Sequence, residues 1–337
     1  MAAISYRQSP HVNNTYQQKG VITEEIQGLI RVHSNGFVER PPIVPCVSCS
    51  SSSQSSRAVT SRDIFINKET NLWARLYVPV SCNTNLIKPL LVYFHGGGFC
   101  VGSASWSCYH EFLTNLASKA NCIILSVEYH LAPENRLPSA YEDGFATVMW
   151  LKQESLNNSS GQKWWLSQTN LSSSLYLAGD SAGANIAFNV GSRISSNTSL
   201  ALKGIILIQP FLGGEERTIS EKQYSNQFLT LSTSDTYWRL SLPLGANRDH
   251  HYCNPLVHGF SKLRDLRVSG VLVCVSELDI MRDRNLGFSD ALVRAGKKVE
   301  TVMFKGVGHA FQILNNSQLS QSRAQEMINH IKNFISQ

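Results

Sequence analysis

The chain has 337 residues, of which 42% are hydrophobic and 16% are charged, and its formal net charge is +6. This length and composition predict a single large domain, residues 1–337, with a sizeable buried core. The charge is mild, and no Lys/Arg cluster is interleaved with aromatic residues, which argues against nucleic-acid binding.

The longest apolar stretches have the length of a strand, so the sequence predicts no membrane-spanning helix and no membrane partner. Residues 1–8 lack the apolar core of a secretory signal, and eight cysteines without such a signal indicate reduced thiols. We therefore expect a cytoplasmic protein, with the nucleus as a second compartment. Cys46 and Cys49 form a C-x-x-C match. No second cysteine pair completes a zinc site, and no helix follows the match, as it would in a redox-active C-x-x-C motif. No metal or organic cofactor is expected.

The N-terminal part of the chain carries few regular patterns. Residues 1–20 are polar and predict a mobile segment. Residues 24–32 predict a short helix or strand that contributes to a lid. Residues 46–57 are rich in serine and predict a flexible loop.

Eight strand-like segments follow the serine-rich loop. From the third onward they alternate with helical segments, which predicts parallel strands joined by crossovers, whereas the first two suit an antiparallel edge. One predicted helix starts at Pro138 and another covers about residues 320–335, each with apolar residues at helical spacing. The strand candidates are residues 63–67, 72–78, 89–95, 122–127, 174–178, 202–209, 271–275 and 299–304.

The alternation stops between Pro210 and Val268, where no clear strand is visible. We expect an inserted helical cap at about residues 211–262, working together with about residues 1–60. Its apolar side chains either line a ligand pocket or pack the cap onto the sheet.

A candidate nucleophile lies between a strand and a helix. Residues 179–183 read G-D-S-A-G, a G-x-S-x-G match with Ser181 at its centre. A serine at a tight strand-to-helix turn exposes its hydroxyl at the carboxyl edge of a sheet, and backbone N–H groups at the helix start can stabilise an oxyanion. The motif alone is short enough to occur by chance.

A glycine-rich loop follows the strand candidate at residues 89–95. His95 is followed by Gly96, Gly97 and Gly98, and glycines at this point suit a loop whose N–H groups approach a ligand. No Lys-Ser/Thr pair follows, and the glycine spacing fails the dinucleotide fingerprint. The arrangement therefore favours an oxyanion hole over a phosphate loop.

The base and the acid of a serine hydrolase are expected further along the chain. His309 lies on a loop with Gly306 and Gly308 after the last strand candidate, from which it can reach Ser181. The competing histidines are His95, which more plausibly bonds backbone in the glycine loop, and three that lack a strand to place them: His250, His251 and His258.

The orienting acid is expected after the strand candidate at residues 271–275. Asp279 lies four residues past this strand, where a loop carboxylate can meet His309. Glu277 and Asp283 are the alternatives, since a single acid in a loop is most often only solvated.

The chain resembles the plant carboxylesterases of the hormone-sensitive-lipase-like branch of the α/β-hydrolases. The resemblance extends from about residue 25 to the C-terminus and rests on six motifs in order: residues 36–40, 95–99, 127–134, 137–143, 179–185 and 308–311. It implies an α/β-hydrolase fold, in which an eight-stranded, mostly parallel sheet is flanked by helices and carries a helical cap.

The resemblance also implies the site. Ser181 is the nucleophile, Asp279 the orienting acid and His309 the base, with oxyanion donors from the backbone of Gly97, Gly98 and Ala182 and with His95 and Gly96 completing the loop motif. The expected reaction is hydrolysis of small-molecule carboxylic esters of plant metabolism through an acyl-enzyme, by a monomer or homodimer.

Two departures and several alternatives accompany the resemblance. His130 stands where the family usually has Arg, and Phe188 where many members have His. Related gibberellin receptors keep the fold but lose the catalytic histidine, so the presence of His309 argues against a receptor. A dehydratase or lyase, or ester cleavage followed by decarboxylation in an alkaloid pathway, stays open.

Overall fold

The computed structural model describes residues 20–49, 58–80, 87–156, 164–197, 200, 202–224, 228–257, 259, 261–314 and 317–337. The mobile segment predicted for residues 1–20 lies outside this part of the chain except for Gly20. Most of the serine-rich loop, residues 50–57, also lies outside it.

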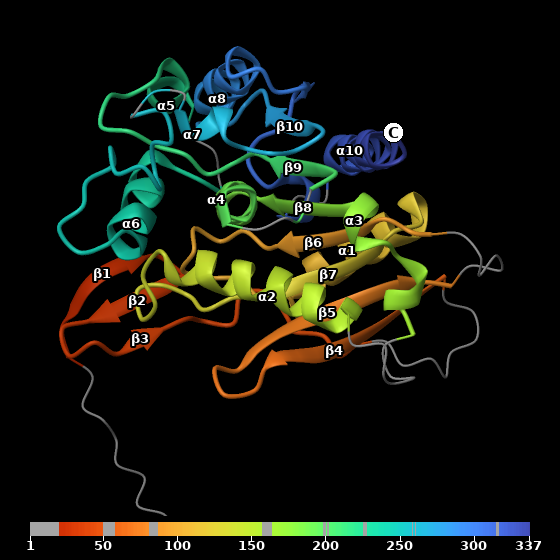
Figure 1. Ribbon diagram of the computed structural model, residues 1–337. Coiled ribbons are helices and arrows are strands. Elements are labelled where there is room, and N and C mark those ends of the chain that lie inside the picture. Colours follow the sequence, from red (N-terminus) through yellow and green to blue (C-terminus); the bar gives the residue numbers. More distant parts are fainter. Residues whose placement is uncertain are drawn as a thin grey trace, which may run out of the picture.

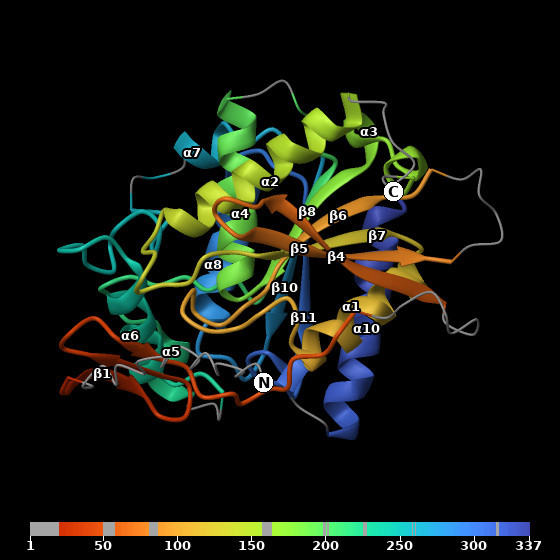
Figure 2. The same cartoon turned by 90° about the horizontal axis from the view of Figure 1, so that it is seen from below.

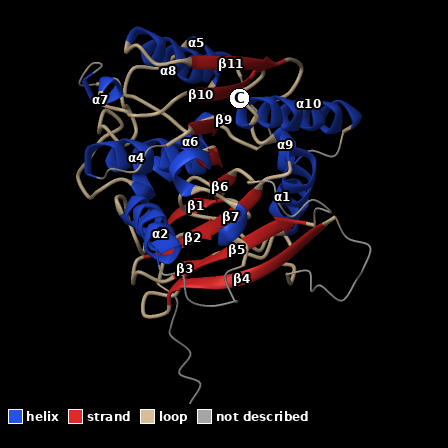
Figure 3. Ribbon diagram, turned by 45° about the vertical axis from the view of Figure 1, so that its right-hand side comes forward, coloured by secondary structure: helices blue, strands red, loops and turns tan. Residues whose placement is uncertain are grey.

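The centre of the molecule is an eight-stranded sheet with strand order β11-β10-β9-β8-β6-β7-β5-β4. Strands β6 to β11 are mutually parallel, and β5 and β4 complete the sheet as an antiparallel edge, as the sequence predicted. Figure 3 shows the strands from β4 at one edge to β11 at the other. Their bounds are β4 Val59–Asn67, β5 Leu72–Pro79, β6 Leu90–Phe94, β7 Ile123–Glu128, β8 Leu175–Asp180, β9 Gly204–Ile208, β10 Val271–Ser276 and β11 Val299–Phe304.

Helices cover both faces of this sheet (Figure 2). One face carries α1 (Ser107–Ala120) and α10 (Gln318–Ile335), and the other carries α2 (Ser139–Leu156), α4 (Ala182–Asn197) and α8 (Arg282–Arg294). The buried central strands are continuous apolar runs, because their side chains point alternately into the cores on the two faces of the sheet. In β6, Leu90, Val92 and Phe94 enter the core under α2 and α4, while Leu91 and Tyr93 enter the core under α1 and α10.

The helix ends follow local chemistry. The side chain of Ser317 accepts a hydrogen bond from the N–H of Ser320 and caps α10, so this helix starts at Gln318 rather than near Ser320. The predicted helix after Pro138 is α2, which begins at Ser139. Short helices fill the connections: α3 Leu171–Ser174, α7 Ser261–Arg264, α9 Phe311–Leu314 and the 3₁₀ turn Leu166–Gln168.

A second, smaller layer lies at one end of the main sheet (Figure 1). The segment predicted as a helix or strand forms β1 (Ile22–Ile26) and β2 (Ile30–His33), which pair antiparallel and are completed by β3 (Val38–Glu39). Beside it lies α6 (Leu231–Ser241), whereas α5 (Ile219–Gln223) packs against α8; both helices fall in the region predicted to lack strands. The guanidinium of Arg239 on α6 bonds both carboxylate oxygens of Glu24 on β1, at 3.0 and 2.9 Å.

Within the described residues, no helix is both long enough and apolar enough to cross a lipid bilayer. The carboxyl ends of the parallel strands face the layer of β1–β3 and α6. In open parallel sheets this is the end at which ligands bind.

Candidate active site

Ser181 occupies the turn between β8 and α4. Strand β8 ends at Asp180 and helix α4 begins at Ala182, so Ser181 takes a left-handed backbone conformation, with φ of 51°. The turn is tight enough that a Cβ atom on Gly183 would lie 1.9 Å from the carbonyl oxygen of Phe94. Only glycine therefore allows α4 to approach β6 so closely.

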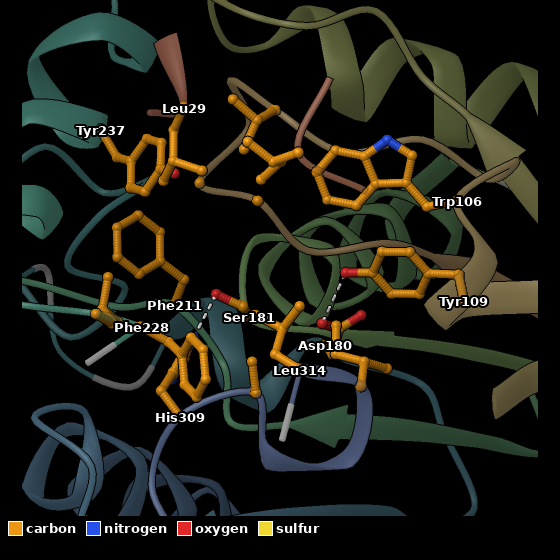
Figure 4. A pocket seen from close by; sticks show the side chains of 17 residues that line it. Leu29, Trp106, Tyr109, Asp180, Ser181, Phe211, Phe228, Tyr237, His309 and Leu314 are labelled. Carbon is orange, nitrogen blue, oxygen red and sulfur yellow. Dashed lines mark hydrogen bonds between the residues drawn. The ribbon is translucent and has the colours of Figure 1, made fainter. Parts of the chain in front are cut away.

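Hydrogen bonds join Ser181, His309 and Asp279 in one chain. Figure 4 shows the bond between Ser181 and His309. The Oγ atom of Ser181 lies 2.9 Å from Nε2 of His309, and Nδ1 of His309 lies 2.7 Å from Oδ2 of Asp279. A carboxylate accepts, so Nδ1 carries the proton and Nε2 is free to accept the hydroxyl proton of Ser181. Asp279 is fully buried, and its other oxygen accepts from the N–H of Met281 at 3.0 Å.

The alternative acids bond elsewhere. Glu277 accepts from the N–H of Gly306 at 2.8 Å, and Asp283 accepts from the N–H of Ser220 at 2.7 Å. Of the three acids considered, Asp279 is the one hydrogen-bonded to His309.

The competing histidines also lie in other surroundings. His95 is fully buried, and its Nδ1 donates to the carbonyl oxygen of Gly96 at 2.8 Å, which is the backbone role expected from the sequence. Burial lowers the pKa of His95 to about 4, so it stays neutral. His250 and His251 stack on each other, with ring centroids 4.4 Å apart, and His258 lies outside the described residues.

The glycine loop runs beside Ser181. Gly97 and Gly98 have φ values of 110° and 58°, and both line the same pocket as Ser181 and His309. The ring of Tyr237, on α6, lies directly over Gly98, since a Cβ there would come within 2.2 Å of the ring. Ala182 opens α4 immediately after Ser181, so its N–H belongs to the unpaired first turn of that helix.

Asp180 is a site residue that the sequence reasoning missed. It is buried between β8 and the glycine loop and accepts from the hydroxyls of Tyr93 and Tyr109, at 2.8 and 3.1 Å, and from the N–H of Gly96 at 3.1 Å. Burial raises its pKa to about 6, although these hydrogen bonds lower it. The signal available in the sequence was a carboxylate directly before the proposed nucleophile, at Asp180.

The pocket above Ser181 is small and apolar. Its volume is about 90 Å³, and its walls come from α6, from the turn between β1 and β2 and from α9. Figure 4 shows Phe211, Phe228 and Tyr237 on one side and Trp106 and Tyr109 on the other. The remaining lining residues are Leu29, Ile43, Gly97, Gly98, Val101, Asp180, Ser181, Leu229, His309, Ala310, Ile313 and Leu314.

The two departures from the family pattern lie away from the reacting atoms. His130 holds Asp143 at 2.8 Å through Nδ1 and reaches the carbonyl oxygen of Thr70 at 2.7 Å through Nε2. Burial lowers its pKa, but the hydrogen bond and the charge of Asp143 raise it more, so the net shift is upward. Phe188 packs edge-to-face on Phe288, with centroids 4.9 Å apart.

In the parts of the chain that the structure describes, no group of three His, Cys, Asp or Glu side chains converges to hold a metal ion. The thiols of Cys46 and Cys49 are free. Cys46 instead forms an isolated antiparallel bridge with Trp106, at the wall of the pocket.

The fold and the site define the class of this protein. A model of the alpha/beta hydrolase fold family matches residues 91–313, so the chain belongs to that family. The prediction of an α/β-hydrolase fold is confirmed, and similar solved structures agree with it. An esterase from Pyrobaculum calidifontis is 26% identical, with a TM-score of 0.68 over 81% of this chain and 84% of that chain.

Within the family, the chain groups with the plant carboxylesterases. It is 47% identical to the Arabidopsis thaliana protein named "Probable carboxylesterase 6", over 94% of this chain and 92% of the relative. A gibberellin receptor of Arabidopsis thaliana is 35% identical over 77% of this chain and 76% of the relative.

Proposed function

We propose that this protein is a serine carboxylesterase that hydrolyses neutral esters of small plant metabolites through an acyl-enzyme. The observation that carries the proposal is the hydrogen-bonded chain from Ser181 through His309 to Asp279 at the floor of an apolar pocket. The plant carboxylesterases to which the chain is similar support the reaction class.

The mechanism begins with attack by Ser181. Its Oγ adds to the ester carbonyl carbon while Nε2 of His309 accepts the hydroxyl proton, and Asp279 holds the imidazole in the correct tautomer and stabilises its positive charge. The carbonyl oxygen becomes an oxyanion that accepts from the backbone N–H groups of Gly97, Gly98 and Ala182. One such donor contributes about 3–4 kcal/mol of transition-state stabilisation.

Collapse of the tetrahedral intermediate releases the alcohol, which takes the proton from His309. Water then attacks the acyl-enzyme and gives its proton to His309, and the second collapse returns that proton to Ser181 and releases the carboxylic acid. In each half of the reaction His309 accepts one proton and gives it back, so the proton transfers balance. No redox step occurs.

The pocket indicates what kind of ester fits. Among the described residues that line it there is no lysine or arginine, and Asp180 lies at its wall, so these residues offer an anionic substrate no counter-charge. A cavity of about 90 Å³ is far below the roughly 300–1,000 Å³ typical of pockets for drug-sized ligands. The site therefore favours a short, uncharged acyl group.

The small layer at the carboxyl end of the sheet acts as the cap in this proposal. The cap was expected at about residues 1–60 and 211–262, and within the described part of these ranges Leu29, Phe228 and Tyr237 supply pocket walls. Two segments distant in the chain thus close over Ser181, and substrate choice lies mainly in them.

The experiment that tests the function combines turnover with covalent labelling. Wild-type protein should hydrolyse p-nitrophenyl acetate and react with a fluorophosphonate probe at Ser181, and Ser181→Ala should lose both. The matched control is Ser126→Ala, because Ser126 is a fully buried serine of β7 outside the pocket. Hydrolysis that persists in purified Ser181→Ala would exclude the proposed nucleophile.

The same readouts, extended to His309→Ala and to product analysis on candidate plant metabolites, separate the two other functions named among relatives. A receptor would neither label nor turn over ester. A relative from Glycyrrhiza echinata, 32% identical, is named 2-hydroxyisoflavanone dehydratase. Elimination of that kind, without an acyl-enzyme, would survive Ser181→Ala but not His309→Ala.

A further inference from the structure

Gln209 follows the end of β9, between the strands that carry the proposed nucleophile and the proposed acid. Its side chain is fully buried, and its backbone is left-handed, with φ of 47°. A non-glycine residue in this conformation is uncommon and needs surrounding structure to hold it.

The carboxamide of Gln209 bonds in two directions at once. Its Nε2 donates to Oγ of Ser276 at 2.5 Å, and its Oε1 accepts from the N–H of Ala310 at 2.7 Å. Ser276 is the last residue of β10, three positions before Asp279, and Ala310 directly follows His309. One neutral side chain therefore connects the strand before the acid to the loop of the base.

The backbone around Gln209 reaches the nucleophile as well. The N–H of Gln209 donates to the carbonyl oxygen of Cys274 on β10 at 2.8 Å. The preceding carbonyl, of Ile208, accepts from the N–H of Ser181 at 2.8 Å. Ile208, the last residue of β9, and Gln209, the residue after it, therefore contact the segments that carry all three residues of the hydrogen-bonded chain.

We propose that Gln209 is a positioning residue for the ester hydrolysis proposed above, on which this inference rests. It touches none of the reacting atoms. It fixes the loop that carries His309 against β10, and so holds Nε2 at hydrogen-bonding distance from Ser181 while Nδ1 stays on Asp279. The loop by itself would not hold His309 in this position. Ala310, like Gln209, has an uncommon left-handed backbone, with φ of 56°, which needs surrounding structure to hold it.

The chemistry of an amide suits this position. One end must accept a backbone N–H and the other must donate to a hydroxyl, in a site closed to water. Methionine has nearly the same length but makes neither bond. Glutamate can accept from both partners, because the hydroxyl of Ser276 can reverse its direction.

The test compares Gln209→Met and Gln209→Glu with wild type, using p-nitrophenyl acetate. Gln209→Met is expected to lower kcat by about 10- to 100-fold with KM changed less than about threefold, since misplacing a catalytic group costs rate rather than binding. Labelling by the fluorophosphonate probe should slow by a similar factor. Gln209→Glu should recover most of kcat.

The matched control is Tyr176→Phe. It removes the buried hydrogen bond from the hydroxyl of Tyr176 to the carbonyl oxygen of Ile335, at 3.2 Å, near the start of β8 and therefore at the opposite end of the sheet. It should lower stability without lowering kcat.

Several outcomes would overturn the inference. These are a folded Gln209→Met with kcat within twofold of wild type, a loss of kcat that Gln209→Glu does not recover, or an equal loss in Tyr176→Phe. If Gln209→Met does not fold, Ser276→Ala removes one of the two bonds, and an unchanged kcat in that variant would overturn it. Failure of wild-type hydrolysis would instead refute the proposed function itself.

Discussion

The N–H of Gly96 donates a hydrogen bond to Oδ1 of Asp180, at 3.1 Å. The residue before the proposed nucleophile thereby holds the loop that carries the proposed oxyanion donors Gly97 and Gly98. Nucleophile and oxyanion loop come from different strands, β8 and β6, so this contact fixes their separation directly.

Removing the carboxylate of Asp180 should therefore cost activity. Asp180→Ala removes the acceptor shared by Gly96, Tyr93 and Tyr109. We expect kcat for p-nitrophenyl acetate to fall by about 10- to 100-fold with a smaller change in KM, because the oxyanion donors shift. Tyr93→Phe, which removes one of the three contacts, should have a smaller effect. An unchanged kcat in folded Asp180→Ala would show that the loop holds its position without this residue.

Asp180 should also make stability depend on pH. Its pKa is about 6 in the folded protein and about 3.9 in an unfolded chain, so between pH 4 and 6 the folded state binds more protons. The contribution of Asp180 to the free energy of unfolding therefore falls as pH rises through this window, by about 3 kcal/mol in total. Asp180→Asn lacks this contribution. Urea unfolding at pH 4 and 7 measures the difference in free energy of unfolding between wild type and Asp180→Asn. This difference should change by roughly that amount in favour of the variant as the pH rises, and a constant difference would contradict the prediction.

Asp279 should matter more than its neighbouring acid. Asp279→Asn replaces an acceptor for Nδ1 of His309 with a group that favours the wrong tautomer, and we expect kcat to fall by about 10³- to 10⁴-fold. Glu277→Gln is the matched control, because the side chain of Glu277 accepts from the N–H of Gly306 in the same loop region and not from His309. Comparable losses in both variants would remove the reason for choosing Asp279.

Phe228 should limit the length of the acyl chain. Its side chain lines the pocket and is 37% exposed, so truncation enlarges the cavity at little cost to the core. We expect Phe228→Ala to raise kcat/KM for p-nitrophenyl hexanoate relative to the acetate by about tenfold. Leu244→Ala serves as control, since Leu244 is an exposed residue outside the pocket. An unchanged preference would place the length limit on another wall.

The ion pair between Arg239 and Glu24 should tune closure of the cap. The side chains are 55% and 32% exposed, so the pair contributes less than about 1 kcal/mol and is screened by salt. Arg239→Gln and Glu24→Gln should each raise KM by at most about fivefold at low ionic strength and have no effect in 1 M salt. A double-mutant cycle measures the coupling, and additive effects on KM would mean that the pair does not hold the cap.

The sequence by itself determined the features that depend on residues close together along the chain. The apolar runs defined the parallel strands, and the segment at residues 299–304 became β11 without change. The glycines around Ser181 and after His95 predicted the two tight turns, because only glycine allows the close backbone approach that Gly183 makes to Phe94. Strand β4 starts at Val59, earlier than expected, since an edge strand pairs through its backbone and tolerates polar residues such as Ser61.

The tertiary structure alone decided which distant groups meet. Asp180 bonds the glycine loop, and Gln209 bridges to Ser276 and Ala310, across separations of up to 101 residues. Of the three acids that the sequence offered, Asp279, the expected one, is hydrogen-bonded to His309. These contacts follow from the strand order, which sets β9 between β8 and β10 and β6 beside β8. Side-chain bonds a few ångströms long depend on that order and on register, and neither is encoded in the spacing of residues along one segment.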